Sequence, residues 1–99
     1  SPGQMESHYA PEKPVVLNIT APNKDDIHIS FGADTSTLNL SPTLNLSPNG
    51  DLVTAAAHLY AMLREADAME GARITIAPIP DDGLGRAIND RLSRAAAAQ

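Results

Sequence analysis

The chain has 99 residues, 42% of them hydrophobic and only 3% aromatic, which predicts one small globular domain with an aliphatic core. Its formal net charge is −5 and it has no cluster of lysine or arginine, so we expect no direct contact with nucleic acid. The absence of cysteine excludes disulfides and cysteine-based zinc sites. The sequence also has no long apolar run and no signal peptide, and these absences together favour a cytoplasmic location.

The first segment, residues 1–14, has the features of a linker that lies on a surface. It opens on a turn sequence at Pro2, and it has no apolar periodicity that would bury it. His8 and Tyr9 stand together between proline-containing corners, and their side chains can form hydrogen bonds to a surface outside this chain. We therefore expect residues 1–14 to form a linker and residues 15–99 to form the folded domain.

Two strands are predicted directly after the linker. Residues 15–19 form a run rich in β-branched side chains between two prolines, which is typical of a buried strand. Residues 27–31 alternate apolar and polar, which puts Ile27, Ile29 and Phe31 on the core face. The connection between the strands is too short for a helical crossover, so we expect them to be antiparallel neighbours or not adjacent.

A hexapeptide occurs twice in succession, as Thr37–Pro42 and again as Thr43–Pro48. The second copy leads directly into a predicted helix. Two copies of so short a unit cannot build a repeat architecture. We therefore interpret the first copy as a tolerated duplication in a loop.

Two helices and a further strand are predicted in the second half of the chain. Residues 51–69 form a helix with Asp51 near its start and Gly71 as its stop signal, and residues 84–97 form a second helix. Residues 73–77 form a strand parallel to a neighbour, because a helix stands on each side of it. The apolar stripes are expected at Leu52, Ala56, Leu59, Leu63 and Ala66 of the first helix and at Leu84, Ile88, Leu92 and Ala95 of the second. The predicted fold is a small α/β layered domain with a mixed sheet and at least two covering helices.

Few residues in this domain suggest chemistry of their own. Gly83 and Gly85 follow a strand and open a helix, where backbone N–H groups can bind an anion, but Asp81 and Asp82 beside them would repel phosphate. We therefore expect a turn and a helix start there, with a small-ligand site as the alternative.

The three histidines, His8, His28 and His58, do not have the spacing of a metal site, and His58 lies outside the apolar stripe. Arg91 is expected to form a structural ion pair or to bond to a carbonyl group, and nothing in the sequence assigns a substrate to Asn89 or Arg91. No metal site is predicted.

Four motifs occur in order along the chain: Ser1-Pro2-Gly3 with His8-Tyr9-Ala10-Pro11, then Asn45–Leu52, Leu59–Asp67 and Pro80–Leu92. Together they resemble the interdomain linker and C-terminal domain of the two-domain L-threonylcarbamoyladenylate synthases. The corresponding family patterns are P-G-M-x-x-x-H-Y-A-P, N-L-S-P-x-G-D-L, N-L-F-x-x-L-R-x-L-D and G-L-G-x-A-I-N-D-R-L. Gln4 replaces the usual methionine of the linker pattern, and Glu6 stands where the family commonly has an aromatic residue.

This resemblance implies a Rossmann-like fold for residues 15–99 and a YrdC-like catalytic domain that precedes the linker and is its partner. That domain would use ATP and magnesium to join threonine and bicarbonate into threonylcarbamoyl-adenylate, for the threonylcarbamoyladenosine modification of tRNA. The resemblance further implies that the linker folds over that active site through the matching residues Ser1, Pro2, Gly3, His8, Tyr9, Ala10 and Pro11. The chain alone is expected to be inactive and to hold no cofactor. A stand-alone module that binds a small ligand at Gly83 and Gly85, or that dimerises through an apolar helix face, is the alternative.

Overall fold

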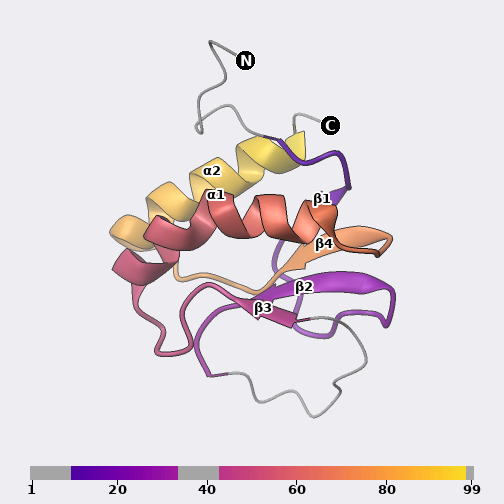
Figure 1. Cartoon of the computed structure of the whole chain (residues 1–99). Helices are drawn as coiled ribbons and strands as arrows, with labels where there is room; N and C mark the ends of the chain where they lie inside the picture. The colour runs from indigo at the N-terminus through magenta and orange to yellow at the C-terminus, as the bar shows by residue number, and fades with distance from the viewer. Residues whose placement is uncertain (1–9, 34–42, 98–99) are drawn as a thin grey trace.

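The computed structural model of the chain describes residues 10–33 and 43–97, which form one four-stranded sheet and two helices (Figure 1). The elements in chain order are β1 (Val15–Val16), β2 (Asp26–Ser30), β3 (Thr43–Asn45), α1 (Leu52–Ala68), β4 (Arg73–Ile76) and α2 (Leu84–Ala97). The predicted layered α/β fold with two helices is confirmed. Both helices lie within one residue of their predicted bounds at each end.

The strands are arranged in the order β1-β4-β2-β3, and every pairing is parallel. The sheet is therefore parallel and not mixed, which corrects that part of the prediction. β4 lies between β1 and β2, so the first two strands are not adjacent. Because β4 comes late in the chain and inserts between two early strands, no local pattern could have fixed its neighbours.

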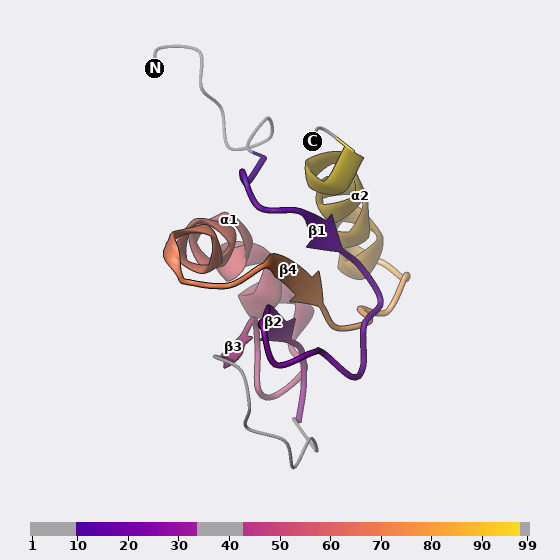
Figure 2. The ribbon, with the colours of Figure 1, turned by 90° about the vertical axis from the view of Figure 1, so that its right-hand side faces the viewer.

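The two faces of the sheet differ in chemistry. Ile27 and Ile29 of β2 are in register with Ile74 and Ile76 of β4, and all four are at most 1% exposed. This aliphatic face packs against α1 through Leu59, Leu63 and neighbouring alanines, while α2 packs against β1 and α1. Figure 2 shows α1 beside β4 and β2, and α2 beside β1.

The opposite face of the sheet is polar and nevertheless buried. It carries Asp26, His28 and Ser30 of β2 and Thr75 of β4, all at most 7% exposed. Residues 17–25, which join β1 to β2, pass on the side of the sheet away from α1 (Figure 2). His28 Nδ1 and Thr75 Oγ1 are 2.9 Å apart, and Arg73 donates to both carboxylate oxygens of Asp26 at 2.8 and 3.2 Å. Burial of these groups is tolerated because they are hydrogen-bonded.

Two features shorten or redirect the predicted elements. β1 ends at Val16, before the predicted bound at residue 19. The strand is interrupted because Asn18 adopts a left-handed backbone with φ of 60°. After this interruption the Ile19 N–H donates a hydrogen bond to the Ile76 carbonyl at 2.9 Å. α1 ends at Ala68 with Met69 as C-cap, so Gly71 is not its terminator. A Cβ on Gly71 would lie 2.6 Å from the Ile27 side chain, and this close approach explains the glycine.

The apolar stripes are shifted slightly from the predicted positions. Ala55 is buried in α1, whereas Leu52 and Ala56 are only partly buried. In α2, Gly85 takes the inward position predicted for Leu84, whose side chain is 41% exposed. The Pro80 carbonyl lies so close to Gly85 that a Cβ there would be 1.8 Å from the oxygen. The small residue faces inward because backbone, and not another side chain, fills the space opposite it.

Candidate functional site

Residues 10–13, which belong to the predicted linker, lie against α1. Pro11 is buried and Ala10 is half-buried. The N–H groups of Glu12 and Lys13 donate to the two carboxylate oxygens of Asp67 at 3.1 and 3.0 Å, and Lys13 Nζ donates to the Asp67 carbonyl at 2.5 Å. The predicted linker residues Ser1, Pro2, Gly3, His8 and Tyr9 lie outside the described residues.

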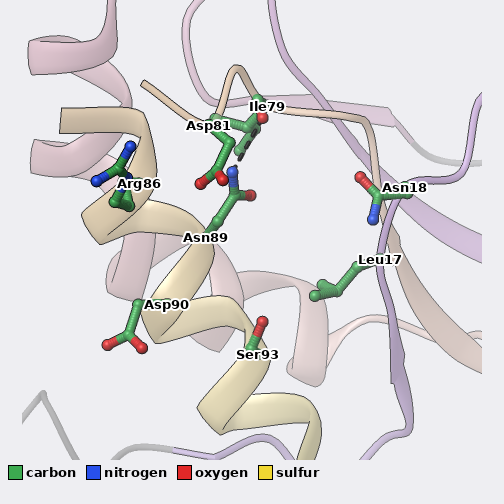
Figure 3. A pocket seen from close by; sticks show the side chains of 8 residues that line it. All are labelled: Leu17, Asn18, Ile79, Asp81, Arg86, Asn89, Asp90 and Ser93. Atoms are coloured by element: carbon green, nitrogen blue, oxygen red, sulfur yellow. Dashed lines mark hydrogen bonds between the residues drawn. The ribbon is translucent and has the colours of Figure 1, made fainter. Parts of the chain in front are cut away.

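A polar crevice of about 480 Å³ opens where β1 and β4 end (Figure 3). Leu17 and Asn18 follow β1 on one wall, and Ile79 follows β4 on the other. The remaining lining residues are Asp81 and four side chains of α2: Arg86, Asn89, Asp90 and Ser93. Ligands of parallel α/β folds bind at the carboxyl ends of the strands, so this position matches a general rule for such folds.

Asn89 fixes one wall of the crevice. Its Nδ2 donates to the Ile79 carbonyl at 3.0 Å, which attaches the middle of α2 to the segment after β4 (Figure 3). Across the crevice, the left-handed backbone at Asn18 turns the chain so that its side-chain amide faces the opening (Figure 3). The Asn89 side chain therefore has a structural role in the described domain.

The charged residues around the crevice are exposed. Asp90 accepts a hydrogen bond from Arg94 Nε at 2.9 Å, a surface ion pair within α2. Asp81 and Arg86 lie at the rim of the crevice and are largely in solvent. Because water screens exposed charges strongly, these side chains by themselves do not indicate which ligand the crevice would bind.

The turn at Gly83 and Gly85 is built mainly by backbone contacts. The Gly85 N–H donates to the Asp82 carbonyl at 3.0 Å and the Arg86 N–H donates to the Gly83 carbonyl at 3.1 Å. Two donors at the start of α2 are therefore already satisfied within the turn. The hypothesis of a ligand at this turn stays a prediction.

The other singled-out side chains have ordinary structural surroundings. Arg91 Nη1 donates to the Ala87 carbonyl at 3.3 Å on the surface of α2, one of the roles expected for it. His58 is exposed on α1, as its place outside the apolar stripe predicts. His28 is buried on the polar face of the sheet, where alternation alone gave no sign that the second face would also be covered.

A second, smaller depression of about 210 Å³ lies between α1 and α2 and is lined mainly by apolar side chains. Leu84 borders it, and Val53 on α1 is 67% exposed. This is the apolar helix surface on which the dimerising alternative would depend.

The described part of the chain contains neither a candidate metal site nor a candidate membrane span. Residues 10–33 and 43–97 contain no group of three histidine, aspartate or glutamate side chains that could hold a metal ion. Within the same residues, neither helix is long and apolar enough to span a membrane.

Asp26 and Arg73 form an ion pair at the edge of the buried polar face, with 2.8 Å between Arg73 Nε and a carboxylate oxygen of Asp26. The hydrogen bonds from Arg73 hold the pKa of the Asp26 carboxyl below its ordinary value, with further help from the Asn23 N–H. On the surface, the Thr54 hydroxyl and the Val53 N–H lower the pKa of Asp51, the N-cap of α1. Both shifts come from structural interactions, and neither residue lines the crevice.

Comparison with known proteins identifies the chain's relatives. The family model described as the C-terminal domain of threonylcarbamoyl-AMP synthase matches residues 1–97. Comparison with curated proteins gives no match. The family match covers the linker pattern and the three motifs of the folded domain, so the resemblance found in the sequence is confirmed. The chain belongs to the family of threonylcarbamoyl-AMP synthase C-terminal domains.

Proposed function

We propose that the chain is the non-catalytic C-terminal domain and the active-site-covering linker of an enzyme that forms threonylcarbamoyl-adenylate from threonine, bicarbonate and ATP. The product would serve the threonylcarbamoyladenosine modification of tRNA. The observation that carries this proposal is the family match, which begins at residue 1 and so includes the linker motif as well as the folded domain.

The catalytic steps are assigned to a preceding YrdC-like domain. The family's reaction needs ATP and magnesium, whereas residues 10–33 and 43–97 contain no group of three histidine, aspartate or glutamate side chains that could hold a metal ion. Asp81 and Asp82 stand where a triphosphate would meet the start of α2 and would repel it. We therefore derive no catalytic step from the described domain.

The linker is the part of the chain proposed to touch the reaction. Tyr9 can donate a hydrogen bond through its hydroxyl, and His8 through a ring nitrogen, to carboxylate or phosphate oxygens of a bound substrate. An extended segment laid over the site would also exclude water, which strengthens those hydrogen bonds. The contacts at residues 12 and 13 with α1 support this role, because they give the linker a fixed end on the folded domain.

The test is pyrophosphate release in the presence of threonine, bicarbonate and magnesium-ATP. The 99-residue chain alone is expected to release none, and the same chain joined to its YrdC-like domain is expected to be active. Turnover by the chain alone would overturn the proposal. An upstream reading frame that encodes a YrdC-like domain would support it directly.

A second candidate function is a stand-alone module that binds a small ligand. The crevice at the carboxyl ends of β1 and β4 favours this alternative, since such positions bind ligands in many α/β folds. Titration of the isotope-labelled chain with small amino acids and carboxylates would test it. Shifts confined to the amides of Asn18 and Asn89 would support a ligand site, and unchanged spectra at millimolar ligand would remove this alternative.

A further inference from the structure

We propose that Asp67, together with Glu12 and Lys13, forms a clasp that anchors the linker to α1 and sets the direction in which it leaves the domain. The clasp is the group of three hydrogen bonds that join these residues across more than 50 positions of sequence. This inference rests on the proposed function, because the anchored segment matters for catalysis only if the linker covers an active site.

The geometry of the clasp is reciprocal. Each carboxylate oxygen of Asp67 accepts one backbone N–H, from Glu12 at 3.1 Å and from Lys13 at 3.0 Å. In return, Lys13 Nζ donates to the Asp67 carbonyl at 2.5 Å. One residue of the helix thus binds the linker through its side chain and its main chain. Hydrogen bonds to ionised groups are about twice as strong as those between neutral groups, so this arrangement is suited to hold a chain segment in place.

The position of Asp67 in α1 is unfavourable for the helix itself. The carboxyl end of a helix carries a partial negative charge, so an aspartate in the last turn is repelled by it. The last turn of α1 has no basic residue of its own. Lys13 supplies the missing positive charge from the linker, at the Asp67 carbonyl. The contact therefore stabilises the end of the helix as well as the position of the linker. Binding of the linker explains why an aspartate occupies this otherwise unfavourable position.

The clasp is followed directly by the sheet. The Pro14 carbonyl accepts a hydrogen bond from the Ile74 N–H at 2.8 Å, and β1 begins at the next residue, Val15. The backbone from residue 12 to residue 15 is therefore held on one side by α1 and on the other by β4. The point at which the linker leaves the folded domain is therefore fixed by contacts to two different elements.

The first test measures amide hydrogen exchange in the 99-residue chain with Asp67→Asn. This substitution keeps the size of the side chain but replaces one acceptor oxygen with an NH2 group, which faces an N–H donor. We expect exchange at the Glu12 and Lys13 amides to rise about tenfold or more, with no change at core amides away from the clasp, such as Leu59 of α1. Glu65→Gln is the matched control, because it removes the same charge from an exposed position of the same helix. Unchanged exchange at Glu12 and Lys13 would overturn the clasp.

A second variant tests the same idea without touching α1. Lys13→Met removes the ammonium group, keeps the apolar stem, and leaves both backbone N–H donors in place. We expect a smaller rise, about threefold to tenfold, in exchange at Glu12 and Lys13. If Asp67→Asn fails to fold, this variant still decides the question: equal exchange in Lys13→Met and the native chain would count against the clasp.

The final test uses the chain joined to its YrdC-like domain. We expect Asp67→Asn to lower kcat/KM for pyrophosphate release about threefold to thirtyfold while leaving the melting temperature of the YrdC-like domain unchanged. If Tyr9→Phe lowers the rate and Asp67→Asn does not, the anchor is dispensable and this inference fails while the proposed function stands. If neither substitution changes the rate, the part of the proposed function that places the linker over the active site fails, whereas the exchange experiment still reports on the clasp.

Discussion

Replacement of Gly85 by alanine should destabilise the domain, although glycine-to-alanine changes in helices usually stabilise. A Cβ at this position would lie 1.8 Å from the Pro80 carbonyl oxygen and 3.0 Å from its carbon. Both neighbours are backbone atoms, so neither can rotate away. The first turn of α2 or the segment after β4 would have to move by roughly 1 Å or more, in a densely packed region. We expect a loss of about 2–3 kcal/mol in the free energy of unfolding, a large part of the roughly 5–15 kcal/mol of a domain of this size.

The measurement is urea unfolding of the native chain and the Gly85→Ala variant, followed by circular dichroism at 222 nm. Gly83→Ala is the matched control: its φ is +57° and no atom lies within 4 Å of the added Cβ, so only backbone strain of about 1 kcal/mol is expected. Ser93→Ala on the exposed face of α2 should be neutral or slightly stabilising. A Gly85→Ala variant as stable as the native chain would refute the argument that backbone contact selects the glycine.

Three further predictions concern the core, a helix cap and the repeated hexapeptide. The pKa of the Asp26 carboxyl is lowered in the folded state. The ionised carboxylate therefore stabilises the fold fully at pH values above its ordinary pKa of about 3.9, and this stabilisation is lost as the pH falls through the pKa of the folded state. The stability difference between the native chain and Asp26→Asn should therefore shrink between about pH 5 and pH 2 in urea titrations; a difference independent of pH would contradict the assignment. Asp51→Ala removes the acceptor for the Val53 N–H and should lower the melting temperature by about 5 °C. An unchanged melting temperature would mean that the N-cap does not stabilise the domain. Deletion of Thr37–Pro42 should cost about 1 kcal/mol or less, because Thr43–Pro48 keeps the junction into α1; unfolding of the variant would show that the first copy is structurally required.

The helices and most strands could be predicted because their signals are local. Leu59 and Leu63 repeat at helical spacing, and Ile27 and Ile29 alternate as in a half-buried strand. These patterns depend on a few neighbouring residues, and the structure confirms them. The α2 bounds follow in the same way from the glycine-rich turn before it and the alanine-rich end.

Features that depend on distant parts of the chain could not be read from these patterns. The parallel order of the sheet follows from the insertion of β4 between β1 and β2. The burial of His28 and Asp26 depends on residues 17–25 covering a second face, and the left-handed backbone at Asn18 ends β1 early.

The same limit applies to the candidate site. The linker motif at Ala10 and Pro11 was recognisable from its sequence, but its attachment to α1 was not, because Asp67 lies more than 50 residues away. An acidic residue in the last turn of a helix was the one available signal, since it is unfavourable there without a partner. Asn89 belonged to a recognised motif, but its bond to the Ile79 carbonyl became visible only with the course of the chain after β4.

The central claim is that the linker takes part in catalysis by the joined enzyme, and the Tyr9→Phe substitution tests it most directly. The change removes one hydroxyl and keeps the aromatic ring, and His58→Ala on the exposed face of α1 serves as the control. If the hydroxyl stabilises a bound oxyanion, pyrophosphate release should fall about tenfold to a thousandfold in Tyr9→Phe and stay unchanged in His58→Ala. Equal rates for Tyr9→Phe and the native enzyme would contradict a catalytic role of the Tyr9 hydroxyl, and the linker would then only connect the two domains.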